Sequence, residues 1–238
     1  PDQVDPATLD VVFLCLPHGV SAPAAERFVD AGVTTIDLSG DFRLADDALH
    51  DRIYGVARRD DLAREAVYGL TEHAREALVG ARLIANPGCY ATCAALPLVP
   101  LALAGLLPDL VVIDAKSGVS GAGRSPTPST HFVGVFGDVR PYKPGTAHRH
   151  VPEIRQALGG HPRVVFNPHV VPIERGIEET IVLPGAHHDA VRRVLEERYA
   201  DEPFVEVLPA GSFARIRAVA RTNRAQIAVH DADDADAV

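Results

Sequence analysis

The feature that most constrains this sequence is a sharp turn between an apolar strand and an apolar helix. A strand is predicted over 81–85, and a long helix over 90–104. Pro87 and Gly88 enforce the turn, because proline fixes φ and glycine adopts backbone angles that other residues avoid. Cys89 is therefore expected where the strand has ended and the helix begins.

Cys89 has the setting of a reactive thiol. The free N–H groups at a helix N-terminus favour a thiolate, and a thiolate can form a thioester with an activated carboxyl group. The alternative is a packed structural cysteine, which is common in proteins. Cys93 lies one helical turn further on, and Cys15 lies inside an apolar run, so both are predicted to be core residues.

The composition is that of an ordinary globular protein of one or two domains, because 47% of the 238 residues are hydrophobic and 23% are charged. The net charge of −9, without a run of Lys and Arg, argues against nucleic-acid binding. No apolar stretch is long enough to cross a membrane, and the first residues do not have the pattern of a signal peptide. Three cysteines without a C-x-x-C pair favour a reducing, cytoplasmic compartment.

The first part of the chain predicts an open, parallel α/β sheet. A continuous apolar run over 10–16 is typical of a strand buried on both faces. A helix is predicted over 21–31, with Ser21 as its N-cap, and a second strand over 33–38. Strand, helix and strand with short connections form a βαβ unit.

Two short segments follow these strands directly and are expected at a ligand site. They are His18-Gly19 and Ser39–Arg43, and ligands of such sheets bind at the carboxyl ends of the strands. However, no G-x-G-x-x-G turn precedes residue 10, as a dinucleotide-binding domain would require. Either the fold binds no dinucleotide, or the first βαβ unit lies outside this chain.

The second part of the chain predicts an α+β domain, rich in strands with flanking helices. A buried strand over 109–115 runs into a loop of small residues, and a later strand is predicted over 214–220. Many backbone N–H groups and little steric bulk suit contact with a flat ligand or an anion, although a flexible connector is the alternative. The candidate residues of this loop are Ser117, Gly118, Ser120 and Gly121.

The region around two histidines is the second candidate for chemistry. His148 and His150 bracket Arg149 just before a predicted helix, and Tyr142 precedes them. Histidine exchanges protons near pH 7, so this pattern favours acid/base catalysis or substrate contact, with an ordinary helix entry as the alternative. No acidic or cysteine residue stands at a matching spacing, so no metal site is predicted.

Three arginines are candidates for binding a carboxylate or a phosphate. They are Arg43, Arg149 and Arg175, since the guanidinium group offers a bidentate fork, although a surface arginine is more often simply solvated. Several of the eleven histidines stand in polar, surface-like surroundings, among them His50 and His161.

Several motifs together resemble one known enzyme family. They are Leu16-Pro17-His18-Gly19, Asp41-Phe42-Arg43-Leu44, Tyr68-Gly69-Leu70, Asn86-Pro87-Gly88-Cys89-Tyr90-Ala91-Thr92, Ser117-Gly118-Val119-Ser120-Gly121-Ala122-Gly123-Arg124, His148-Arg149-His150-Val151-Pro152-Glu153-Ile154 and Pro172–Ile177. In their order and spacing they are similar to those of the N-acetyl-gamma-glutamyl-phosphate reductases of arginine biosynthesis. The resemblance covers most of the chain.

The resemblance implies an α/β fold like that of aspartate-semialdehyde dehydrogenase. A partial NADP-binding Rossmann domain would span 1–88, and an α+β catalytic and oligomerisation domain would span 89–238. The implied reaction is the NADPH-dependent reduction of N-acetyl-glutamyl 5-phosphate to N-acetyl-glutamate 5-semialdehyde, in a homo-oligomer (dimer or tetramer). Cys89 would hold the acyl group as a thioester, and His148 would be the acid/base residue.

The resemblance also implies contacts with the cofactor and the substrate. The residues expected along NADP(H) are His18, Gly19, Ser39, Ser117, Gly118, Ser120 and Gly121. The residues expected near the substrate are Tyr142, Arg149, Arg43 and Arg175.

The sequence departs from the family at both ends. The family's opening glycine-rich βαβ unit is absent, and so is its closing helix with an Asn-Leu-x-Lys-Gly motif. We therefore expect the second domain to be C-terminally truncated. We also expect this chain by itself to bind NADPH poorly and to be weakly active or inactive.

Three other functions remain open at this point. The related aminoadipyl-phosphate reductase of lysine biosynthesis usually has Asn after the nucleophile, so Tyr90 favours the arginine branch. A cofactor-free cysteine hydrolase or acyltransferase is a second alternative, but the parallel sheet and the small-residue loop argue against it. The third is a non-catalytic protein, for which replacement of Cys89 would change nothing.

Overall fold

The chain forms two compact units, Pro1–Gly88 and Cys89–Val238. The computed structural model describes all residues except 1, 2, 124, 126 and 233–236, so Arg124 of the small-residue loop and part of the acidic C-terminal tail lie outside the described residues. Within the described part of the chain, no helix is long and apolar enough to cross a membrane.

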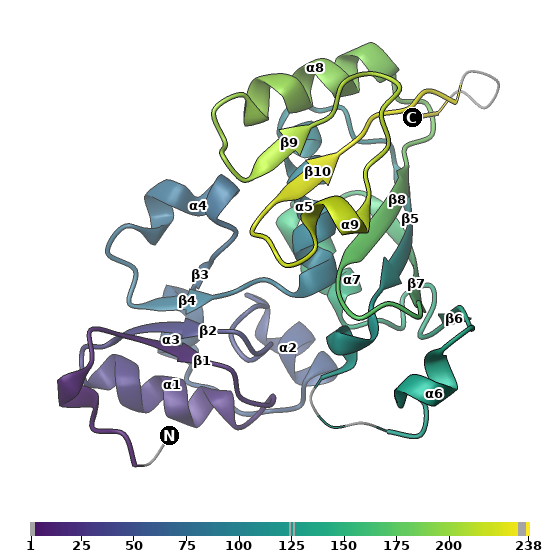
Figure 1. Ribbon diagram of the computed structural model, residues 1–238. Helices are drawn as coiled ribbons and strands as arrows, with labels where there is room; N and C mark the ends of the chain where they lie inside the picture. The colour runs from purple at the N-terminus through teal and green to yellow at the C-terminus, as the bar shows by residue number, and fades with distance from the viewer. Residues whose placement is uncertain (1–2, 124, 126, 233–236) are drawn as a thin grey trace. The chain divides into compact units, whose positions relative to one another are not determined.

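The first unit is built on the predicted parallel sheet (Figure 1). Its strands lie in the order β1-β2-β4-β3, and all neighbouring pairs are parallel. The strands are β1 (Val11–Leu14), β2 (Thr34–Asp37), β3 (Val67–Tyr68) and β4 (Leu83–Ala85). The helical segments are η1 (Pro6–Thr8), α1 (Ser21–Asp30), α2 (Asp47–Ile53), α3 (Asp60–Glu65) and α4 (Thr71–Leu78).

β1 contradicts the prediction of a strand buried on both faces. It has one neighbour, β2, among the described strands, and the side chain of Phe13 is 63% exposed. Cys15, which was predicted to be a core thiol, is also exposed. The core of this unit lies instead on the face that α1 covers, where Leu14, Phe28 and neighbouring residues are buried.

Two local predictions in the first unit are wrong. Ser21 is the first residue of α1 rather than its N-cap, and its Oγ donates a hydrogen bond of 2.5 Å to Asp37 Oδ1. His50 was predicted to be surface-like but is 1% exposed, with Nε2 at 3.0 Å from the carbonyl oxygen of Val56. Burial and the nearby Arg58 lower the pKa of His50.

The second unit contains a mixed sheet in the order β6-β7-β5-β8, in which β5 and β7 are parallel and the other pairs antiparallel. A separate parallel pair is formed by β9 and β10. The strands are β5 (Leu110–Ser117), β6 (Arg140–Pro141), β7 (Arg163–Val170), β8 (Ile177–Val182), β9 (Val205–Val207) and β10 (Ala225–Ile227). The helical segments are α5 (Cys89–Leu103), η2 (Val119–Ala122), α6 (Phe132–Val135), α7 (His150–Ala157), α8 (His188–Tyr199) and α9 (Ile216–Val219).

α5 is the central helix of the second unit and contacts α7, α8 and β8 (Figure 1). It is apolar around most of its circumference, as expected of a helix surrounded by other elements. Pro97 and Pro100 lie inside it, and the helix nevertheless continues to Leu103. The predicted helix over 90–104 is thereby confirmed to within one residue at each end.

The strand predicted over 214–220 is absent, and the short helix α9 occupies this segment. Alternating apolar and charged residues there suggested a strand. In the structure the Ile216 side chain packs against Gly176, where an added Cβ would lie 2.4 Å from it. The segment is too short for its sequence pattern to distinguish the two-residue period of a strand from the 3.6-residue period of a helix.

Candidate active site

Cys89 is the first residue of α5 and is exposed. The first turn of α5 carries no acidic side chain, so the positive end of the helix is not neutralised by its own residues. Cys93, one turn further on, is only half-buried as a residue, but burial and the neighbouring Glu179 and Glu178 raise the pKa of its thiol well above its ordinary value. The surroundings therefore distinguish an accessible Cys89 from a Cys93 held as a thiol.

Cys89 lines a cavity of about 860 Å³ in the second unit. The walls come from α5, β8, α9 and β10, and they are formed by many apolar side chains such as Leu96 and Ile181. The cavity also brings together the following predicted residues: Cys89, Ser117, Gly118, Ser120 and Gly121. Its size suits a small organic ligand.

Two backbone N–H groups of the small-residue loop are already used within the protein. The backbone N–H of Gly118 donates to Gly176, and that of Ser120 donates to Glu174, at 3.0 and 3.1 Å. A Cβ on Gly118 would lie 2.8 Å from the backbone nitrogen of Arg175, so glycine is needed there by the protein's own packing. Ser120 and Gly121 remain exposed.

A cluster of aromatic rings surrounds Tyr90, the residue that follows Cys89 in the sequence. The Tyr90 side chain is 2% exposed, and its ring contacts His148, His150 and Phe166 at centroid distances of 5.6, 5.9 and 5.2 Å. Tyr142 O–H donates to the Tyr90 hydroxyl at 3.1 Å, and the Tyr142 ring lies 5.5 Å from the His148 ring. The structure thus brings Tyr142 and His148 together around Tyr90, which lies on the same helix as Cys89.

His148 is 7% exposed and is held in a defined tautomer. Its Nδ1 accepts a hydrogen bond of 3.1 Å from the backbone N–H of His150, so the proton of the neutral ring is on Nε2. Burial, together with the cations of Arg149 and Lys143, lowers the pKa of His148 to about 4. The neutral imidazole is therefore the form present near pH 7.

Burial also raises the pKa of Tyr142, and the nearby Cys89 adds to this effect. The thiol of Cys89 is thus close enough to Tyr142 to influence its ionisation.

Tyr90 was not among the predicted site residues, because its position in an apolar helix is typical of a core residue. The only signal for it was its place directly after the candidate nucleophile.

Two of the three predicted arginines lie in the second unit, and both are exposed. Arg149 is an exposed residue at the N-cap of α7, and Arg175 lies in the turn before β8, where its Nε is 3.3 Å from Glu174 Oε1. Neither is among the residues that line the cavity around Cys89. Their contact with a substrate stays a prediction.

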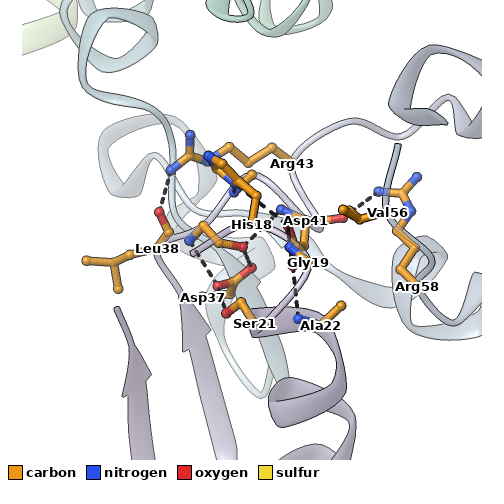
Figure 2. Close-up of polar contacts among 12 residues, drawn as sticks. His18, Gly19, Ser21, Ala22, Asp37, Leu38, Asp41, Arg43, Val56 and Arg58 are labelled. Atoms are coloured by element: carbon orange, nitrogen blue, oxygen red, sulfur yellow. Dashed lines mark hydrogen bonds and ion pairs between the residues drawn. The ribbon is translucent and has the colours of Figure 1, made fainter. Parts of the chain in front are cut away.

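In the first unit, the residues predicted for a ligand site form a closed hydrogen-bond network (Figure 2). The Asp41 carboxylate accepts from the backbone N–H groups of Gly19 and Ala22, at 2.9 and 3.0 Å. It therefore caps α1 in place of Ser21. Burial alone would raise the pKa of Asp41, but the nearby His18 and the hydrogen bonds from the Gly19 and Ala22 N–H groups outweigh it and hold the pKa below its usual value.

Ser39 and His18 belong to the same network. Ser39 Oγ donates to Asp37 Oδ2 at 2.7 Å and accepts from the backbone N–H of Asp41 at 3.0 Å. His18 Nδ1 accepts from the backbone N–H of Gly40 at 2.8 Å, and its side chain is 29% exposed. Asp41 lies in the segment Ser39–Arg43 that was expected at a ligand site, whereas Asp37, the last residue of β2, was not predicted as a site residue.

Arg43 links the segments that follow β2 and β4 by hydrogen bonds. It is 7% exposed, and it donates from Nε to the carbonyl oxygen of Asn86 and from Nη2 to that of Leu38, both at 2.7 Å (Figure 2 shows the second bond). This gives the guanidinium a structural role in the loops after β2 and β4. Its predicted contact with substrate stays a prediction.

The comparisons with known proteins agree with this fold. Residues 1–81 match the model of the semialdehyde dehydrogenase NAD binding domain, and residues 89–238 match that of the semialdehyde dehydrogenase dimerisation domain. Aspartate semialdehyde dehydrogenase II from Vibrio cholerae superposes with a TM-score of 0.73, at 16% identity, over 99% of this chain and 74% of that one. The enzyme from Candida albicans, determined with NADP, superposes with a TM-score of 0.54 at 15% identity, over 88% and 64% of the two chains.

The sequence relatives are more specific. N-acetyl-gamma-glutamyl-phosphate reductase from Nitrosomonas europaea is 42% identical over 99% of this chain, and that from Halorhodospira halophila is 44% identical over 97%. The chain spans 70% and 69% of the lengths of these two relatives. It therefore belongs to the N-acetyl-gamma-glutamyl-phosphate reductases, within the semialdehyde dehydrogenase family.

Proposed function

We propose that this protein reduces N-acetyl-glutamyl 5-phosphate to N-acetyl-glutamate 5-semialdehyde with NADPH, in the cytoplasmic synthesis of arginine. The observation that carries the proposal is the exposed Cys89 at the start of a buried helix, in a chain more than 40% identical to reductases of that name. We further propose that the protein acts as a homo-oligomer, which is supported by the match to a dimerisation domain.

Cys89 is the proposed nucleophile. Its thiolate attacks the acyl carbonyl carbon, a carbon–sulfur bond forms, and the bond to the phosphate oxygen breaks with release of inorganic phosphate. The product of this step is a thioester on Cys89. The helix N-terminus supports the step because it stabilises the thiolate form.

His148 is the proposed acid/base residue. In the tautomer imposed by the N–H of His150, Nε2–H donates a hydrogen bond to the acyl oxygen, on which negative charge develops when the thiolate attacks. A pKa lowered to about 4 keeps the ring neutral near pH 7 and makes its protonated form more acidic than that of an ordinary histidine. Tyr142 and Arg149 are proposed substrate contacts beside it, with Arg175 and Arg43 as the other predicted contacts.

The residues predicted for the cofactor fit an uncharged ring better than a phosphate. The Asp41 carboxylate already occupies the N-terminus of α1, and Gly19 N–H donates to it. The exposed groups that remain are the imidazole edge of His18 and the surface of Ser120 and Gly121. We propose contacts with NADP(H) for His18, Gly19 and Ser39 in the first unit and, as a separate proposal, for Ser117, Gly118, Ser120 and Gly121 in the second unit.

When bound, NADPH would supply the hydride that reduces the acyl group to the aldehyde, and the carbon–sulfur bond would break to return the Cys89 thiolate. The choice of NADP rather than NAD is part of the proposal, since the matching domain model names NAD and one structural neighbour was determined with NADP.

The test is steady-state turnover of the intact protein on two acyl phosphates with NADPH and with NADH. We expect turnover of N-acetyl-glutamyl 5-phosphate with NADPH to exceed that of a carrier-protein-bound aminoadipyl phosphate. The proposal fails if the carrier-bound substrate is preferred, or if the acyl phosphate is hydrolysed without oxidation of NADPH. A Cys93→Ser variant is the matched control, since it should retain turnover that a Cys89→Ser variant loses.

A further inference from the structure

The turn over 173–176, which directly precedes β8, is joined to the small-residue loop through the backbone. Consecutive N–H groups of the loop donate to carbonyl oxygens of the turn, in the pairs Gly118 to Gly176, Val119 to Ile173 and Ser120 to Glu174, at 3.0, 2.9 and 3.1 Å. These bonds join backbone to backbone, so the loop must follow the position that the turn takes. We call the turn over 173–176 the support turn.

The support turn is in close contact with α9. Gly176 has a φ of 115°, which residues with a Cβ rarely adopt, and a Cβ there would lie 2.4 Å from Cγ2 of Ile216. The Ile216 side chain therefore lies directly against the backbone of the residue that accepts the hydrogen bond from Gly118. Both Ile216 and Gly176 line the cavity at Cys89.

The residue after α9 makes a second contact with the support turn. Arg221 follows the C-cap residue Ala220 and has a φ of 63°, at a position where glycine is the usual residue. Its Nη2 pairs with the Glu174 carboxylate, and both side chains are exposed, so the pair adds little to stability. A strained backbone and an exposed ion pair do not explain this arginine by stability. Its side chain instead joins the end of α9 to the support turn.

The small-residue loop matters because, in the proposed function on which this inference rests, Ser120 and Gly121 contact NADP(H). We propose that Ile216 and Arg221 are positioning residues, which hold the support turn and thereby place Ser120 and Gly121 for the cofactor. Neither residue was predicted from the sequence. Cys89 is carried by α5, which contacts α7, α8 and β8, so its reaction with the acyl phosphate should depend less on the support turn.

The test measures the two steps of the reaction separately in the intact protein. Acylation of Cys89 is followed by the burst of phosphate release without NADPH, and cofactor use by the KM for NADPH in steady state. Ile216→Ala removes the contact with Gly176, so the turn and the loop can shift. We expect the KM for NADPH to rise about tenfold while the burst rate changes less than about twofold.

A second variant, Arg221→Gly, separates positioning from stability. Glycine adopts the backbone conformation of residue 221 without strain, so the thermal unfolding midpoint should be at least that of the wild type. The tie to Glu174 is lost, so the KM for NADPH should still rise about threefold. Arg221→Gly decides the question even if Ile216→Ala does not fold.

Val207→Ala on β9 is the matched control, because it shortens a half-buried aliphatic side chain of the same unit that is not among the residues lining the cavity. It should leave both measurements unchanged. The inference is overturned if either Ile216→Ala or Arg221→Gly keeps the wild-type KM for NADPH, or if Ile216→Ala slows acylation and reduction by the same factor. Failure of the proposed function looks different, since the wild-type protein would then show neither a phosphate burst nor oxidation of NADPH.

Discussion

His148 shows how neighbouring residues decide the chemistry of a side chain. The sequence indicated a histidine with a role near pH 7, but its ring is buried among other rings with two cations close by, and its pKa is lowered to about 4. The sequence could identify the residue from its neighbours in the chain. It could not predict the tautomer or Tyr90, because both depend on contacts between residues far apart in the chain.

The first prediction concerns stability at acidic pH. The pKa of His148 is about 4 in the folded state and about 6.5 in the unfolded state, so unfolding takes up a proton between these values. The free energy of unfolding should therefore fall by roughly 3 kcal/mol as the pH drops from 6.5 to 4. Urea denaturation of His148→Gln should show a smaller loss over this range, whereas the exposed His131→Gln should behave like the wild type.

The second prediction concerns the three thiols. Cys15 and Cys89 are both exposed, so accessibility alone does not distinguish them, while the pKa of Cys93 is raised. We expect iodoacetamide at pH 7 to modify Cys89 first, because only Cys89 stands at a helix N-terminus. Peptide mapping of a time course measures this order, and faster labelling of Cys15 would contradict the proposed activation.

The sequence predicts helices and strands whose own residues show a strong pattern. It does not predict features that depend on contacts with distant parts of the chain. α5 follows from its apolar length and the Pro-Gly turn, and β2 from its β-branched run between turns. The exposure of β1 was missed, because a sequence does not tell which strand lies at an edge. The start of α1 was placed correctly, but its cap comes from Asp41, twenty residues after Ser21 in the chain.

The cap of α1 can be tested by Asp41→Ala. The variant loses the acceptor for the N–H groups of Gly19 and Ala22, so it should lower the free energy of unfolding at pH 7 by about 1–2 kcal/mol. The folded-state pKa of Asp41 is lowered, so its contribution is present above the unfolded value near 4 and is lost as pH falls through the folded value. Denaturation curves should therefore converge in acid, and the exposed Asp51→Ala should match the wild type throughout.

For Glu179 on β8, the predicted dependence of stability on pH has the opposite sign to that for Asp41. Both its carboxyl oxygens are buried without a nitrogen or oxygen partner among the described residues, and burial raises its pKa well above the ordinary value. The protonated form is stable in the fold, so stability is lost as pH rises above the unfolded value near 4.5. Glu179→Gln should therefore increase the free energy of unfolding at pH 8 by at least about 1 kcal/mol.

The neighbouring Glu178 provides the control for this variant. Its carboxylate faces the other side of β8 and pairs with Lys116 Nζ at 3.2 Å. Glu178→Gln should bring no gain at pH 8. Equal stability of Glu179→Gln and the wild type at pH 5 and pH 8 would show that the buried carboxyl is not protonated.

At the scale of the whole molecule, the two units match two successive domains of one family, an NAD binding domain and a dimerisation domain. The fold class was predicted from the alternation of strands and helices and from the motifs, and it is confirmed by the structural neighbours. The roles assigned to the units rest on Cys89, the residue with which the second unit begins. The proposed function therefore depends on the chemistry of that thiol.

The most direct test is to isolate the acyl-enzyme. The protein is mixed with N-acetyl-glutamyl 5-phosphate in the absence of NADPH, quenched in acid and examined by intact-protein and peptide mass spectrometry. We predict one N-acetylglutamyl group per chain, on the peptide that contains Cys89, removed by hydroxylamine and absent in Cys89→Ser. Acylation elsewhere, or NADPH-dependent turnover by Cys89→Ser at the wild-type rate, would contradict the account.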